Sequence, residues 1–233
     1  MKLILENWKK YLKEHDEPEE GGFEEDEPEK KHAEAMSFRL YDLAEEEKEN
    51  LYRAFEESYV KATGSSWSRD TFLGRAKNWI FFGSVGEKTG IVAVRPQKDG
   101  GRYKLVAIAG DIRGILKGVS LLRSELGNSP IWGLVSSDMT SMAERLGLVA
   151  MHDKPGGPTL LKAIMKLIPP SVFGSYNVEL QNDGGVSVDI KDIGSVSKYF
   201  VANKAYYEQL IEEHGSKVPM LAPTLRFLLK MVK

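Results

Sequence analysis

The middle of the chain carries the clearest pattern of apolar and polar positions. Residues 104–109 form a near-continuous run of small and β-branched side chains, which is typical of a strand buried on both faces. Residues 110–118 are punctuated by glycine, and Val119, Leu121 and Leu122 then follow a helical spacing. Residues 103–123 therefore predict a buried strand, a glycine-rich loop and an apolar helix.

The segment before this strand predicts one more strand, two helices and a hairpin. Residues 37–43 alternate like a strand, and Leu51, Phe55 and Tyr59 are spaced for a helix over 44–62 that ends at Gly64. Ser68 can cap a short second helix. Two apolar runs, 79–85 and 89–95, flank a short turn and read as a hairpin.

The segment after residue 123 continues the alternation of strands and helices. Residues 130–135 read as a strand, and any of Ser136, Ser137 and Asp138 could cap a helix over 139–146, before a last strand at 148–151. This order predicts a mixed α/β or α+β sheet with helices on both faces. Strands 104–109 and 130–135 should be parallel neighbours.

The C-terminal part leaves two arrangements open. Residues 159–167 predict a helix, residues 177–181 and 186–190 a hairpin, and residues 197–211 a further helix. The hairpin could complete the sheet of a domain over 37–155. Alternatively, 156–233 is an extension that covers one face or contacts a partner.

The N-terminal part differs in composition from the rest. Residues 2–14 can form an amphipathic helix, and an acidic segment broken by proline and glycine follows. Residues 1–36 carry a net charge of −6, whereas the remaining chain carries +4. The helix either docks on a partner protein or packs on the body. A charge of +4 is too weak to indicate nucleic-acid binding.

Composition excludes several classes of protein. The chain has no cysteine, so it has no disulfide framework and no thiolate chemistry. Its four histidines have no metal-ligand spacing, so no metal is expected. No apolar run is long enough to span a bilayer and the start does not read as a secretory signal, which predicts a cytoplasmic protein.

The glycine-rich segment allows two interpretations. A strand, a glycine loop and a helix start can form an anion site, because free N–H groups and the positive helix end point the same way. Arg113 and Lys117 would add charge where a phosphate sits. The alternative is an ordinary strand-to-helix turn that uses glycines for tight geometry.

The order of elements resembles the GNAT (Gcn5-related N-acetyltransferase) superfamily over residues 37–155. The family's loop signature, Q/R-x-x-G-x-G/A, is similar to residues 113–118, where Arg113, Gly114 and Gly118 match and Leu116 replaces a usual glycine. The segment MAERLGL at 142–148 resembles a family helix that ends in LGF.

The resemblance implies acetyl-CoA as co-substrate, a small-molecule or protein amine as acceptor, and N-acetyltransferase activity. Pantetheine would lie along the buried strand, and the diphosphate would lie on the loop. The implied residues are Ala107, Ile108, Ala109, Arg113, Gly114, Ile115, Leu116, Lys117, Gly118 and Val119.

Catalytic residues are harder to place. Many family members use a tyrosine as acid at the position of Ala143, which cannot do this chemistry. The remaining candidates are Asp111 at the end of the strand and Ser137 before the next helix. A turn residue is the alternative for Asp111.

The mismatches at Leu116 and Ala143 keep a second function open, namely a GNAT-fold binding or phage virion-associated structural protein without catalysis. The N-terminal helix with its acidic linker also resembles leader segments of tailed-phage proteins.

Overall fold

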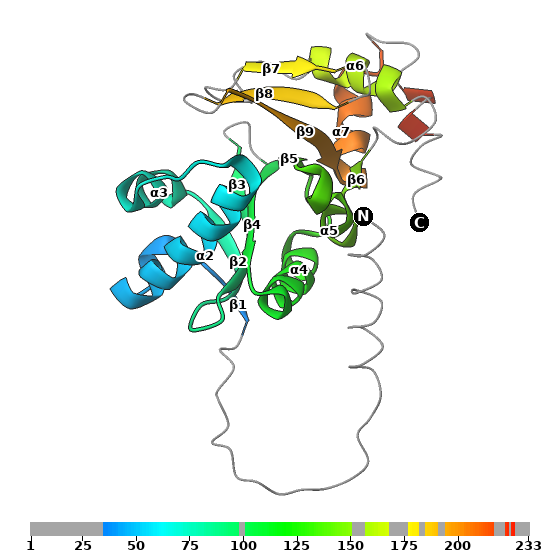
Figure 1. Ribbon diagram of the computed structural model, residues 1–233. Coiled ribbons are helices and arrows are strands. Elements are labelled where there is room, and N and C mark those ends of the chain that lie inside the picture. The colour runs from blue at the N-terminus through cyan, green and yellow to red at the C-terminus, as the bar shows by residue number, and fades with distance from the viewer. Residues whose placement is uncertain are drawn as a thin grey trace, which may run out of the picture. The chain divides into compact units, whose positions relative to one another are not determined.

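The computed structural model describes residues 35–97, 101–150, 157–167, 177–181, 185–190, 194–216, 222–223 and 225–226 (Figure 1). Residues from Ala33 to Lys233 form one compact unit. The expected helix over 2–14 and its acidic linker lie outside the described residues. In the part of the chain that is described, no helix is both long and apolar enough to cross a membrane.

The described strands form one mixed sheet, which confirms the predicted α/β fold class. Its order is β1-β2-β3-β4-β5-β9-β8-β7, and β6 also pairs with β9. Strands β4 and β5 are parallel, as predicted, and the other described pairs are antiparallel. The strands are β1 Met36–Phe38, β2 Ile80–Ser84, β3 Gly90–Pro96, β4 Tyr103–Gly110, β5 Ile131–Val135, β6 Val149–Ala150, β7 Asn177–Leu180, β8 Val186–Ile190 and β9 Gly194–Ala202.

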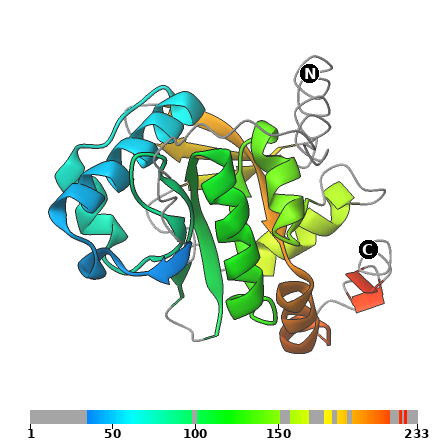
Figure 2. The same cartoon turned by 90° about the horizontal axis from the view of Figure 1, so that it is seen from below.

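Helices α2 (Glu45–Thr63) and α3 (Arg69–Ala76) pack on one face of strands β1–β4, and α4 (Ile112–Leu126) packs on the other (Figures 1 and 2). The sequence signals at their ends act as expected. Gly64 closes α2 in the left-handed conformation with φ 72°, and the Ser68 side chain accepts from the Thr71 N–H at the start of α3. Phe55 and Phe72 then pack against strand residues such as Phe81.

The predicted glycine loop over 110–118 is wrong, because α4 already begins at Ile112. The two glycines of the signature lie in the helix, four residues apart, on the face that meets the sheet. A Cβ on Gly118 would lie 2.3 Å from the carbonyl oxygen of Phe82, and one on Gly114 would lie 2.7 Å from Gly90 Cα. These glycines therefore allow α4 to approach β2 and β3 closely.

Two shorter predictions also need correction. The strand expected over 37–43 is β1 followed by a 3-10 turn, η1 (Leu40–Asp42). The helix expected over 139–146 is a 3-10 turn, η2 (Ser137–Met139), continued by α5 (Thr140–Arg145). Ser136 precedes η2 but makes no side-chain capping hydrogen bond.

The helix expected over 197–211 is right only in its second part: residues 197–202 belong to strand β9, and helix α7 (Lys204–His214) begins after Asn203. Strand β9 pairs with β8 through its first half and with β5 and β6 through its second half. Asn203 marks the change from strand to helix. Its Oδ1 accepts from the N–H groups of Ile131 and Tyr206, both at 3.0 Å, and its Nδ2 donates to Ser129 O at 2.7 Å.

A second core lies where β5 and β9 meet the C-terminal helices. Trp132 and Phe200 stack at 5.8 Å between ring centroids, and both are fully buried. Helix α6 (Gly157–Leu167) contributes Leu161 and Ile164, and α7 contributes Tyr207. The C-terminal elements thus join the same sheet and share a core with β5.

Candidate functional site

Strands β4 and β5 are hydrogen-bonded partners only at their first three positions. Tyr103, Lys104 and Leu105 pair with Ile131, Trp132 and Gly133, and the pairing ends there. On its other side, β4 pairs with β3 through a register shift in which Val106 is the extra residue. From Val106 onward, the β5-facing edge of β4 is therefore no longer paired with β5.

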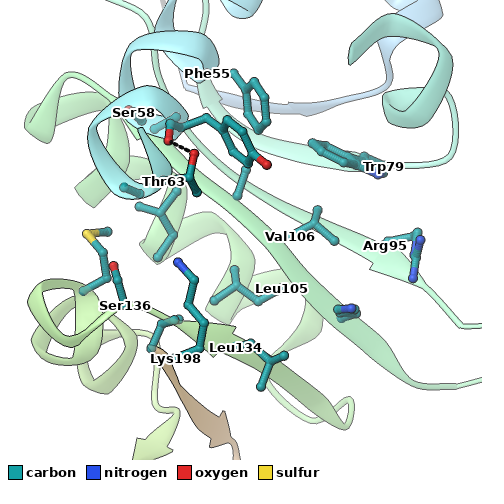
Figure 3. A pocket seen from close by; sticks show the side chains of 18 of the residues that line it. Phe55, Ser58, Thr63, Trp79, Arg95, Leu105, Val106, Leu134, Ser136 and Lys198 are labelled. Carbon is teal, nitrogen blue, oxygen red and sulfur yellow. Dashed lines mark hydrogen bonds between the residues drawn. The ribbon is translucent and has the colours of Figure 1, made fainter. Parts of the chain in front are cut away.

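A pocket of about 440 Å³ opens at this gap (Figure 3). Strand β4 lines it from Lys104 to Ala109, the end of β5 and the residue after it contribute Leu134, Val135 and Ser136, and α2 contributes Ser58, Ala62 and Thr63. This volume is in the range of sites for small ligands and cofactors.

Four aromatic side chains, Phe55, Tyr59, Trp67 and Trp79, form one side of the pocket and are called the aromatic wall below. Their rings are in mutual contact: the centroids of Phe55 and Trp67 are 5.3 Å apart, and those of Tyr59 and Trp67 are 5.0 Å apart. Phe55 and Trp79 are buried, so the wall is a fixed apolar surface.

The pocket is strongly basic. Arg75, Arg95, Lys104 and Lys198 line it, and no aspartate or glutamate is found among its described lining residues. The guanidinium Cζ of Arg75 lies 4.5 Å from the centre of the Trp67 ring. Figure 3 shows the amine of Lys198 directed into the pocket and Arg95 on the side of Trp79.

Burial makes the two lysines weaker bases than usual. Burial, followed by repulsion from Arg95, lowers the pKa of Lys104 to about 8. Burial also lowers the pKa of Lys198, while the carboxylate of Asp138 acts in the opposite direction. Both amines are therefore easier to deprotonate than an exposed lysine.

The structure brings only part of the sequence-predicted site to the pocket. Ala107, Ile108 and Ala109 line it. Residues 113–119 lie in the first turns of α4 and are not among its lining residues, and neither are Asp111 and Ser137. Ser137 is exposed at the start of η2.

Asp111 is the N-cap of α4. Its Oδ2 accepts from the N–H of Arg113 at 2.9 Å and from that of Gly114 at 3.1 Å. Two of the N–H groups that the sequence offers to a phosphate are thus already bonded to a carboxylate of the chain itself. The positive side chains of Arg113 and Lys117 remain exposed nearby on α4.

The two positions that depart from the signatures resembled by the sequence both lie in helices. Ala143 is completely buried in α5, and Leu116 is half-buried in α4. No side chain able to supply a proton stands at position 143.

Sequence reasoning missed the aromatic wall and the basic residues of the pocket. One signal was available, because Lys104 is a charged residue inside an otherwise apolar strand and is only 8% exposed. A buried lysine of this kind is often found at a functional site.

Comparison with solved structures finds proteins of similar fold. The fold is similar to that of a solved structure described as an acyl-CoA N-acyltransferase from Pseudomonas aeruginosa, with 9% sequence identity and a TM-score of 0.43. The match covers 73% of this chain and 99% of that chain. No protein-family model matches the sequence, and no curated protein matches it. At this identity, the likeness concerns the fold alone.

Proposed function

We propose that this protein is an N-acetyltransferase that transfers an acetyl group from acetyl-CoA to an amine, with its reaction centre between β4 and β5. One observation carries the proposal: the pairing of the two strands ends at Leu105 and Gly133, beside a pocket of about 440 Å³. An unpaired strand edge can bind an extended, amide-containing chain by backbone hydrogen bonds. Pantetheine is such a chain.

Within this gap, the strand backbone supplies the polar groups. Residues 106–109 of β4 would hold the pantetheine amides. A backbone N–H at the bulge of Val106 would stabilise negative charge on the thioester oxygen as the amine attacks. The carbon–nitrogen bond forms, the carbon–sulfur bond breaks, and the thiolate takes up a proton.

Proton transfer falls to groups of the pocket. The attacking amine must lose a proton, and no carboxylate is present among the described lining residues to take it. Lys198, with its lowered pKa and its amine directed into the pocket, is the side chain best placed to accept a proton. We assign no part in the chemistry to Asp111 or Ser137.

The diphosphate end of CoA fits less well than the pantetheine end. Arg113 and Lys117 offer positive charge at the start of α4, but the Asp111 carboxylate holds the N–H groups of Arg113 and Gly114. This arrangement favours a second candidate, a protein of the same fold that binds a ligand in the pocket without catalysis.

Two neighbouring serines give a matched test. Ser136 lines the pocket directly after β5, whereas Ser137 is exposed and outside the lining. We expect CoA and acetyl-CoA to bind in calorimetry, thiol release to follow on addition of an amine, and Ser136→Trp to abolish both. The Ser137→Trp control should retain both.

The outcomes separate the two candidates. Binding of CoA without thiol release for any amine supports the non-catalytic protein. Absence of CoA binding at high micromolar concentration, or full activity of Ser136→Trp, contradicts a reaction centre in this gap.

A further inference from the structure

The amine of Lys198 enters the pocket from the C-terminal part of the sheet. Lys198 is the last residue of β9 that pairs with β8, and Tyr199 begins the pairing with β5. Because Phe200 pairs with Leu134, the alternation of side chains along β9 places Lys198 on the same face of the sheet as Leu134. Lys198 and Leu134 both line the pocket. The Lys198 side chain therefore reaches the pocket where β5 ends.

Lys198 is easier to reach than the other lysine among the described lining residues. Figure 3 shows its amine directed into the pocket, and the side chain is half-buried. Lys104, by contrast, is only 8% exposed, and its Nζ lies 5.0 Å from the centre of the Trp132 ring. Lys104 also lies where β4 and β5 are still paired. Of the two amines, that of Lys198 is therefore the one that can meet a group bound in the gap.

Two opposing effects act on the Lys198 ammonium. Burial lowers its pKa, and the carboxylate of Asp138, which is exposed in η2, raises it. Burial is the larger effect, so a greater share of Lys198 is neutral at neutral pH than of an exposed lysine. A neutral lysine amine in a pocket is a nucleophile as well as a base, because its lone pair is available.

The same amine can therefore take part in acyl transfer in two ways. When the pocket holds an acceptor amine, Lys198 can accept the proton that the acceptor loses. When the pocket holds no acceptor, the Lys198 nitrogen is itself an amine within the pocket. Holding a nucleophile and a thioester in one pocket replaces a bimolecular reaction by an intramolecular one.

We propose that Lys198 is a self-acylation site, at which the protein transfers an acyl group from a thioester bound in the gap to its own amine. The neutral Lys198 nitrogen attacks the thioester carbon, the carbon–nitrogen bond forms and the carbon–sulfur bond breaks. The nitrogen loses one proton and the thiolate takes one up, so the products are Nε-acyl-lysine and a free thiol. For an acyl-CoA donor, this role rests on the function proposed above.

Acylation at this position limits itself. The amide nitrogen of an acyl-lysine is not basic, so the modified side chain can neither attack a second thioester nor accept a proton from an acceptor amine. The acyl group also occupies part of the pocket of about 440 Å³. A protein that meets the donor without an acceptor thus modifies itself once and then stops.

The first test incubates the full-length protein with acetyl-CoA and no added amine. We expect thiol release to stop after about one equivalent per protein, and peptide mass spectrometry to show that Lys198 is acetylated about tenfold faster than Lys204. Lys204 is the internal control, because its side chain is 69% exposed and reports ordinary chemical acetylation. Excess CoA should slow the acetylation of Lys198 and leave that of Lys204 unchanged.

Two matched variants sharpen this test. Lys198→Arg keeps the positive charge and should abolish the thiol release that occurs without an amine, whereas Lys204→Arg should retain it. Undiminished thiol release in Lys198→Arg, faster acetylation of Lys104 than of Lys198, or thiol release without acetylation of Lys198 overturns the assignment. The last two readouts use wild-type protein, so they hold even if a variant fails to fold.

The second test replaces the donor by p-nitrophenyl acetate, which carries the same acetyl group and no part of CoA. Faster acetylation of Lys198 than of Lys204 is again expected, because the reactivity of the amine does not depend on the leaving group of one donor. Absence of a preference for Lys198 with both donors overturns the self-acylation site.

Failure of the proposed function is distinguishable from failure of this inference. Preferential acetylation of Lys198 by p-nitrophenyl acetate, together with no reaction of acetyl-CoA with Lys198 or with any added amine, supports the acylation site and contradicts the acetyl-CoA-dependent function. Thiol release from acetyl-CoA on addition of an amine, without preference for Lys198 from either donor, supports the acyltransferase and contradicts the self-acylation site.

Discussion

At the scale of single residues, Asp111 has the most consequential position, because it stands between a structural and a binding role. As the N-cap of α4, it satisfies two N–H groups that would otherwise lack a partner within the helix. The same carboxylate places negative charge where a diphosphate would have to approach. One side chain therefore stabilises the helix and opposes the anion site that the sequence predicts.

The capping role predicts a graded response to substitution. Asp111→Ala should lower the free energy of unfolding by about 1 kcal/mol, since both capping hydrogen bonds are lost. The free energy of unfolding of Asp111→Ser should stay within a few tenths of a kcal/mol of the wild-type value, because a serine hydroxyl can take over the cap. Urea denaturation measures both, and an Asp111→Ala variant as stable as wild type would show that the carboxylate does not act as the cap.

Asp111→Ser also gives a prediction for ligand binding. Asp111→Ser removes a negative charge without removing the cap, so it should bind CoA more tightly than wild type if the diphosphate lies at the start of α4. Calorimetry at low and high salt checks this, because the gain should shrink as salt screens the charge. An unchanged affinity would place the diphosphate elsewhere.

Lys104 gives a prediction in which pH matters. Its pKa falls from 10.5 to about 8 in the folded protein, so between these values the unfolded chain binds a proton that the native protein releases. Stability from this group therefore rises with pH across that window. Below about pH 8, the charged and buried amine destabilises the fold.

Lys104→Met should accordingly stabilise the protein at pH 7 by roughly 1–3 kcal/mol, and the gain should narrow towards pH 10. Urea denaturation at the two pH values measures the difference. Lys204→Met is the control, because that side chain is 69% exposed and its loss removes no buried charge. A loss of stability in Lys104→Met at pH 7 would mean that the fold compensates the buried charge.

At the scale of elements, α4 shows how one sequence signature can serve packing. Gly118 lies against the Phe82 carbonyl, and a Cβ would approach its oxygen to 2.3 Å. Gly118→Ala should therefore push α4 away from the sheet and cost about 1–3 kcal/mol in the free energy of unfolding.

The matched control for this prediction is Gly74→Ala in helix α3. A Cβ there meets nothing within 4 Å, so the substitution should stabilise the protein by roughly 0.5–1 kcal/mol through helix propensity. Thermal or urea unfolding of the two variants gives opposite signs if the glycines of α4 act in packing. A shift of the same sign in both would contradict this role.

Most helices and strands up to β5 could be predicted because they have a local signal. Gly64 and Ser68 mark helix ends, and the hairpin of β2 and β3 is flanked by apolar runs. The start of α4 was missed. Residues 112–118 are helical, but a glycine that allows close packing of a helix looks the same in sequence as a glycine in a loop.

Strand β9 was mistaken for a helix for a related reason. Phe200 and Leu210 fit a helical spacing, and the boundary at Asn203 is set by partners far away in the chain. Asn203 bonds to Ser129 O and to Ile131 N, which are more than seventy positions earlier. Such long-range partners leave no local trace in the sequence.

The candidate site was predictable only along β4. Ala107, Ile108 and Ala109 line the pocket as part of a recognisable buried strand. The basic side chains of Arg95 and Lys104 could not be assigned to the site, because their place at the pocket depends on the register of β3 and β4 and on the extra residue at Val106. A one-residue slip would turn these side chains to the other face.

At the scale of the whole molecule, the site depends on segments that are distant in sequence. The pocket takes residues from α2, from the strands β3, β4 and β5, and from β8 and β9 through Val188 and Lys198. The parting of β4 and β5 persists in the middle of a sheet because β3 holds one strand and β9 holds the other. The C-terminal strands thus have a direct part in keeping the gap open.

This arrangement predicts that residues 33–156 cannot fold without the rest of the chain. A fragment without β9 lacks the antiparallel partner of β5 along Trp132–Val135. It also leaves Trp132 uncovered, because Trp132 stacks on Phe200 of β9. A long apolar edge and an exposed indole favour aggregation. We expect a 33–156 fragment to be insoluble or to lack a cooperative thermal transition by circular dichroism, whereas a 33–233 fragment melts cooperatively. Cooperative melting of the shorter fragment would show that β9 is dispensable, and the gap between β4 and β5 would then have to be held open by β3 alone.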